Sequence, residues 1–65
     1  MAPRTREALE RLRAAFLERP AMHLSVSEAA HLCGLEPDRS EVILDVLVRV
    51  GFLVRTDDGR FSRNL

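Results

Sequence analysis

The sequence contains signals for both ends of one short helix. Ser25 is followed three residues later by Glu28, the spacing of a capping box in which each side chain binds the other residue's backbone N–H. Gly34 then provides a left-handed stop, so a helix is predicted from Val26 to Cys33. The two adjacent alanines in its middle belong to its expected buried face and allow another helix to approach closely.

A longer amphipathic helix is predicted before it, over Thr5–Arg19. Leu9, Leu12 and Phe16 recur at helical spacing there, and Pro20 ends the segment because the residue before proline avoids the α region. Residues 1–4 are expected to be disordered.

A third helix is predicted from Pro37 or Arg39 to Val50, capped by Glu36 or Asp38 and stopped by Gly51. Its predicted core stripe is Ile43, Val46, Leu47 and Val50.

The last segment has the pattern of a β-hairpin. Two runs of strand-forming residues, 52–56 and 60–63, flank the turn Asp57-Asp58-Gly59, and an Asp-Gly pair between such runs is a strong local hairpin signal. A short third strand is predicted near Met22–Leu24. We therefore expect a mainly α protein with a small β-hairpin, in the order of a winged helix-turn-helix domain.

Size and composition restrict the class of protein. The 65 residues form one domain at most, and ten arginines balance ten acidic residues. The exclusive use of arginine suits phosphate binding, but a base-composition bias in the coding DNA is the simpler explanation and the one we prefer. A single cysteine, no signal-like N-terminus and no long apolar run predict a cytoplasmic protein without a membrane span.

Two segments resemble parts of a known superfamily. Leu24–Leu35 looks like the helix-turn-helix entry of winged-helix regulators, and Val46–Phe61 looks like the end of their recognition helix and their wing. The chain as a whole is similar to a group of short, uncharacterised bacterial winged helix-turn-helix proteins over roughly residues 9 to 63. The resemblance implies the fold, and it implies DNA binding by analogy.

Seven residues are candidates for contact with double-stranded DNA. Arg39 and Ser40 would lie where a recognition helix enters the major groove, and the wing arginines would reach the phosphate backbone or minor groove. The serines at the start of the preceding helix could hold a phosphate. The full candidate set is Ser25, Ser27, Arg39, Ser40, Arg55, Arg60 and Arg63.

The charge pattern argues against DNA binding. Residues 21–50 contain two basic and five acidic residues, a balance of −3, whereas affinity for DNA comes largely from neutralised phosphates. Glu41, Asp45 and Arg49 fall on one stripe of the third helix, away from its core face. Leu44 and Val48 lie on another face, where they either bury in the core or form an exposed patch for a homodimer or another protein partner.

No catalytic constellation, metal site or cofactor motif is present. His23, His31 and Cys33 lack the companions of a zinc site, and the three glycines are explained by helix ends and a turn. We therefore expect no enzyme, no cofactor and no small-molecule ligand. Two hypotheses stay open: a small DNA-binding regulator or accessory domain, or a winged-helix module for protein interaction or dimerisation.

Overall fold

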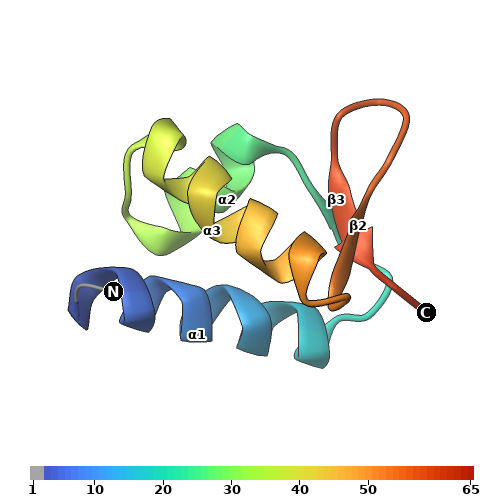
Figure 1. Cartoon of the computed structure of the whole chain (residues 1–65), viewed down its shortest axis with the longest axis horizontal. Coiled ribbons are helices and arrows are strands. Elements are labelled where there is room, and N and C mark those ends of the chain that lie inside the picture. The colour runs from blue at the N-terminus through green and yellow to red at the C-terminus, as the bar shows by residue number, and fades with distance from the viewer. Residues whose placement is uncertain (1–2) are drawn as a thin grey trace.

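A computed structural model describes residues 3–65 of the chain as three helices and three short strands. In chain order they are α1 (Pro3–Glu18), β1 (His23–Leu24), α2 (Val26–Cys33), α3 (Pro37–Arg49), β2 (Leu53–Arg55) and β3 (Phe61–Arg63). α1 lies along one side of the molecule, α2 and α3 pack above it, and the strands close the end away from the N-terminus (Figure 1).

The predicted elements are all present, with one correction at the N-terminus. Pro3 and Arg4, expected to be disordered, form the first turn of α1. Proline suits this place because its missing N–H has no partner in a first helical turn. Residues 1 and 2 of the same prediction lie outside the described residues.

The predicted limits of α2 are confirmed. The Ser25 hydroxyl accepts a hydrogen bond from the Glu28 backbone N–H at 3.1 Å, and the Glu28 carboxylate accepts one from the Ser25 N–H at 2.9 Å. Gly34 ends the helix in the left-handed conformation, with φ of 67°. A side chain there would be strained by the backbone alone.

The cap expected for α3 is absent. Glu36 occupies the N-cap position, but its side chain makes no capping hydrogen bond, so the prediction of a cap from Glu36 or Asp38 is wrong. Pro37 occupies the first helical position and has no N–H, so one fewer backbone donor is left without a partner. Asp38 lies in the first turn, where the helix dipole favours a carboxylate.

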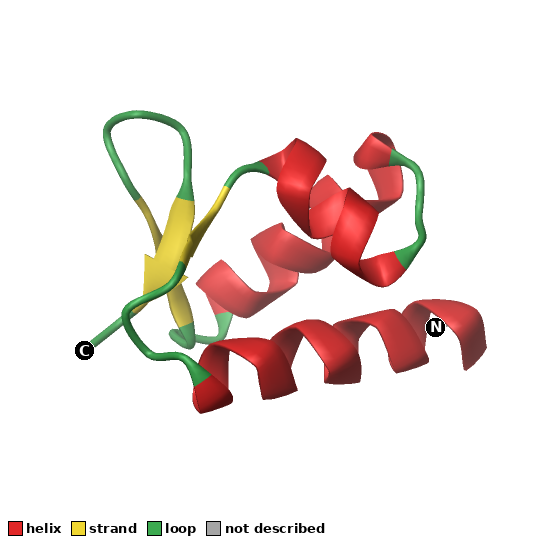
Figure 2. Cartoon of the chain, turned by 180° about the vertical axis from the view of Figure 1, so that it is seen from behind, coloured by secondary structure: helices red, strands yellow, loops and turns green. Residues whose placement is uncertain are grey.

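The three strands form one antiparallel sheet in the order β1-β3-β2. Leu24 pairs with Phe61 on one side of β3, and Arg55 pairs with Phe61 on the other. The predicted third strand is thus confirmed, although it spans only His23–Leu24. The β2–β3 loop extends beyond the helices (Figure 2), and Gly59 takes a positive φ of 82° in its turn.

The core lies between the helices and the inner face of the sheet. Phe16 and Phe61 are fully buried in it, and Phe52 packs partly buried against it. The buried apolar residues are Ala8, Leu12, Phe16, Ala29, Ala30, Cys33, Ile43, Leu44, Leu47, Leu53 and Phe61.

The predicted core stripe of α3 is half wrong. Ile43 and Leu47 are buried, but Val46 is only half-buried and Val50 is 70% exposed. Ser40 and Leu44 occupy the core instead. The stripe is rotated because α3 packs chiefly on α2 and β2, so the side of the helix that faces them is buried.

Over residues 3–65, none of the helices combines the length and the apolar composition that a membrane crossing requires.

Candidate functional site

The start of α2 holds two of the predicted DNA contacts. Ser25 is committed to the capping box, because its hydroxyl already binds the Glu28 N–H. Ser27 is exposed in the first turn of the helix. The carboxylate of Glu28 lies at the same helix end, where an incoming phosphate would meet a negative charge.

Of the two DNA contacts predicted at the start of α3, only Arg39 is exposed. Arg39 is exposed, and among the described residues it takes part in no ion pair. Ser40 is only 1% exposed, so the prediction that it reaches DNA is wrong. It lies on the side of α3 that faces the core, and its hydroxyl has no hydrogen-bond partner within residues 3–65.

Arg55 on β2 is held by α3. One nitrogen of its guanidinium lies 3.1 Å from a carboxylate oxygen of Asp45, and the guanidinium stacks over the ring of Phe61 at 4.9 Å from the centroid. Arg55, which was predicted to contact a phosphate, is therefore paired with an acidic residue of the same chain.

Arg60, at the end of the β2–β3 loop, lies between two carboxylates. Its guanidinium is 4.0 Å from Glu28 and 3.9 Å from Asp58. The pKa of Glu28 is lowered by the hydrogen bond from the Ser25 backbone, by the Ser25 hydroxyl and by the nearby Arg60 charge. The pKa of Asp58 is lowered mainly by its hydrogen bond from the Thr56 hydroxyl. Both carboxylates therefore hold their negative charge beside Arg60.

The side chain of Arg63, on β3, packs against an aromatic ring of the same chain. Its guanidinium stacks on the Phe52 ring at 4.4 Å from the centroid, and its Nε is buried without a hydrogen-bond partner among the described residues. This stacking holds the guanidinium against the ring of a residue that packs partly buried against the core.

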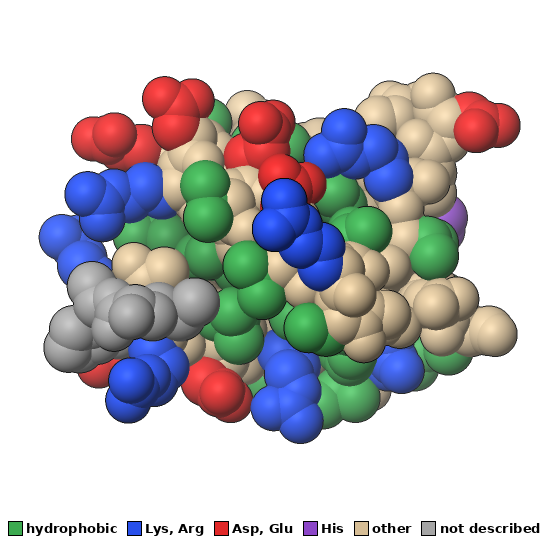
Figure 3. All heavy atoms as spheres, viewed as in Figure 1, with side chains coloured by type: hydrophobic (Ala, Val, Ile, Leu, Met, Phe, Trp, Pro, Cys, Tyr) green, Lys and Arg blue, Asp and Glu red, His purple; other side chains and the backbone are tan. Residues whose placement is uncertain are grey.

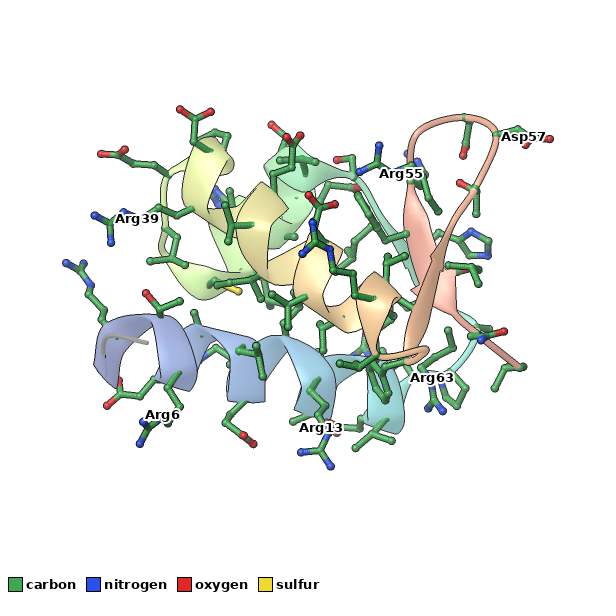
Figure 4. The ribbon with its side chains drawn as sticks, viewed as in Figure 1. Arg6, Arg13, Arg39, Arg55, Asp57 and Arg63 are labelled. Atoms are coloured by element: carbon green, nitrogen blue, oxygen red, sulfur yellow. The ribbon has the colours of Figure 1, made fainter. Side chains whose placement is uncertain are left out.

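The candidate arginines do not form one strip. Figure 4 shows Arg39 and Arg63 toward opposite ends of a molecule 28 Å long, with Arg55 on the hairpin and Arg6 and Arg13 pointing away from α1. In Figure 3, acidic side chains lie over the start of α3 and at the tip of the β2–β3 loop, and arginines are interspersed with acidic side chains over the rest of this face. The surface from α3 to the hairpin therefore lacks the continuous positive potential typical of a DNA-binding face.

The prediction that Leu44 and Val48 form an exposed interface is also wrong. Leu44 has no exposed surface, and Val48 is half-buried and packs against the core. Both side chains help to fill the small core, so the exposed patch proposed for Leu44 and Val48 does not exist.

A different apolar face of α3 is exposed and was missed. Val42 is 59% exposed and Val50 is 70% exposed, with half-buried Val46 between them. Val42 and Val46 lie along one face of α3, and Val50, the C-cap residue directly after the helix, continues their spacing of four; we call these three residues the valine stripe. This spacing is visible in the sequence, but assigning Val46 and Val50 to the core concealed it.

Two hollows lie elsewhere on the surface. The larger, of about 420 Å³, lies between α1, β1 and α2 and has a partly apolar lining; the smaller, of about 240 Å³, adjoins Arg4 and Arg39. The larger is lined by Ala15, Glu18, Arg19, Met22, Leu24, Glu28, His31 and Leu32.

The single cysteine is placed as a core residue. Cys33 is buried, its thiol donates to the Ala8 carbonyl at 3.6 Å, and burial raises the pKa of the thiol. Within residues 3–65, His, Cys, Asp and Glu side chains form no group of three that could hold a metal ion.

Comparison with protein-family models, curated proteins and solved structures finds no match to this chain.

Proposed function

We propose that this chain is a winged helix-turn-helix module that binds a protein partner through α3 and does not read duplex DNA with that helix. The observation that carries the proposal is the exposed surface of α3, where the valine stripe runs beside the acidic residues Glu41 and Asp45.

The order of the elements supports a winged helix-turn-helix fold. α2 and α3 are joined by a short turn at Gly34, and two antiparallel strands follow α3. β1, between α1 and α2, completes the sheet by pairing with β3. In this arrangement α3 corresponds to the recognition helix and the β2–β3 loop to the wing.

The chemistry of α3 suits a protein better than a nucleic acid. Base edges and phosphates in the major groove are recognised mainly by hydrogen-bond donors and positive charges. The exposed valines donate no hydrogen bonds, and the carboxylates beside them repel phosphate. A partner helix with an apolar face would cover the stripe, as in helix-in-groove recognition.

The wing arginines support the same proposal. Arg55 is neutralised by Asp45, and Arg60 lies beside Glu28 and Asp58. A phosphate that approached either guanidinium would also approach a carboxylate of this chain, which repels it.

A DNA titration tests this proposal. The wild-type chain should cause no mobility shift of a random duplex at about 10 µM protein and low salt, where non-specific binders are retained. Asp45→Asn frees Arg55 and should increase duplex affinity by about tenfold, because one positive charge becomes available and one negative charge is lost.

Asp57→Asn is the matched control for that variant. It makes the same change in charge at the exposed tip of the loop, where Asp57 forms no ion pair with another described residue. Tight wild-type binding that weakens steeply with salt would contradict the proposal. A gain in affinity that is equal in the two variants would show that Asp45 does not withhold Arg55 from DNA.

A second candidate, a small DNA-binding regulator, is favoured by one observation. Arg39 is exposed at the start of α3 without an ion-pair partner in the described part of the chain, and Arg4 lines the same small hollow. For this function, Arg39→Ala should lower duplex affinity and relax the preference at one base position.

A further inference from the structure

We infer that the partner of α3 is α3 of a second copy of this chain, packed antiparallel about a two-fold axis at Val46. This inference rests on the proposed function, since it names the occupant of the same surface. Its basis is the self-complementarity of the valine stripe and of the charges beside it.

The valine stripe is symmetric about its centre. Val42 and Val50 lie four residues before and four residues after Val46. When two such helices run antiparallel and cross at Val46, Val42 of each copy meets Val50 of the other, and the two Val46 side chains meet on the axis. The two most exposed residues of the valine stripe are then both covered.

The charges beside the stripe select the antiparallel direction. Glu41, Asp45 and Arg49 lie four residues apart along one side of the helix, in the order negative, negative, positive. Antiparallel packing places Glu41 of each copy on the same side of the contact as Arg49 of the other, offset by two residues, about 3 Å, along the helix axis. The two long side chains can span this offset, which gives two ion pairs. In a symmetric parallel pair, the two charged stripes would lie on opposite sides of the contact, and Glu41 and Arg49 would form no ion pairs across it.

An unpaired Asp45 carboxylate at the centre of this contact would weaken the dimer. The two copies of Asp45 approach each other near the axis, but each is already paired with Arg55 of its own chain at 3.1 Å. The repulsion between them is thereby offset. The same ion pair that withholds Arg55 from DNA thus makes the centre of the interface compatible with a second copy.

The contact is expected to be weak. α3 has 13 residues, and one helix face covers less than the surface that a standard stable interface buries, so the monomer and the dimer should exchange. Association should become visible between about 10 µM and about 1 mM protein.

Sedimentation equilibrium over that range tests the inference. The wild-type mass should rise from 7.4 kDa toward twice that value as the concentration increases. Glu41→Arg and Arg49→Glu should each abolish the rise, because each places like charges opposite each other. The double variant, Glu41→Arg with Arg49→Glu, should restore it.

Val50→Ser provides an independent test, because Val50 is 70% exposed and its replacement removes apolar area from the contact without touching the core. It should shift the association to at least about tenfold higher concentration, because the substitution removes a buried apolar side chain from each of the two copies. Circular dichroism should show unchanged helix content in every variant.

The outcomes separate this inference from the proposed function. A wild-type chain that stays monomeric at about 1 mM, or a double variant that does not recover association, overturns the antiparallel dimer. A monomer that also fails to bind DNA leaves the proposed function in place with a different partner. Salt-sensitive DNA binding overturns the proposed function itself.

Discussion

Ser40 is a polar residue at a place where the fold needs an apolar one. Its side chain is 1% exposed on the core side of α3, and its hydroxyl has no hydrogen-bond partner among residues 3–65. A buried hydroxyl that has lost its hydration without gaining a partner destabilises the folded state.

We therefore predict that Ser40→Ala stabilises the protein. The variant removes an unsatisfied group and improves helix propensity, so the free energy of unfolding should rise by about 0.5–1 kcal/mol. Urea unfolding monitored by circular dichroism measures this change. Ser27→Ala, at an exposed position of α2, is the control for propensity alone, and a destabilised Ser40→Ala would mean that the hydroxyl is satisfied.

Two residues of the valine stripe illustrate what a periodic pattern leaves open. Val46 and Val50 match the helical spacing of Ile43 and Leu47, so the sequence alone places all four on one face. α3 contains more apolar residues than one face can bury, and only its packing against α2 and β2 decides which of them face the core. Burial of Leu44 and exposure of Val50 therefore could not be predicted.

At the scale of elements, the ends of helices and turns are the features that could be predicted. α2 is bounded by a capping box and by a glycine with positive φ, and both signals act within a few residues of chain. The ion pairs of Arg55 and Arg60 could not be predicted in the same way. They join residues of the hairpin to α3 and α2, and only the folded chain brings these elements together.

The capping box of α2 predicts a pH dependence of stability. The pKa of Glu28 in the folded state lies below its usual value of 4.5, because the ionised carboxylate accepts the Ser25 hydrogen bonds. A carboxyl with a lowered folded pKa stabilises the protein at pH values above its unfolded pKa, and this contribution is lost as the pH falls through the folded pKa.

Glu28→Gln should therefore flatten the decline in stability between about pH 5 and about pH 3. Glutamine preserves the capping hydrogen bonds, so the helix is retained while the titrating group is removed. Chemical unfolding at a series of pH values measures the slope. Part of the decline should remain, because the pKa of Asp58 is lowered as well; an unchanged slope would exclude Glu28 as its source.

On the scale of the whole molecule, stability depends on the junction between helices and sheet. The hairpin contributes Leu53 and Phe61 to a core whose other members come from the three helices. A domain of 65 residues has a total stability of about 3–10 kcal/mol. Removing a buried side chain at this junction therefore costs a free energy comparable to the total stability of the domain.

Phe61→Ala should unfold the chain or nearly so. Removing a fully buried phenylalanine costs about 3–5 kcal/mol, which matches much of the available stability. Phe52→Ala is the comparison, since Phe52 is only partly buried and should cost less. Thermal melting followed by circular dichroism distinguishes them; a cooperative transition for Phe61→Ala near the wild-type temperature would show that the helices are stable without the sheet.

The strand order β1-β3-β2 has a consequence for how the protein is made. β3 is the last strand in the chain, yet it lies in the middle of the sheet and donates Phe61 to the core. Ribosomes deliver the chain from its N-terminus, so β1 and β2 emerge with nothing between them. The native arrangement can therefore form only after residue 63 has left the exit tunnel, which makes this a domain that folds after synthesis of its final strand and not during it.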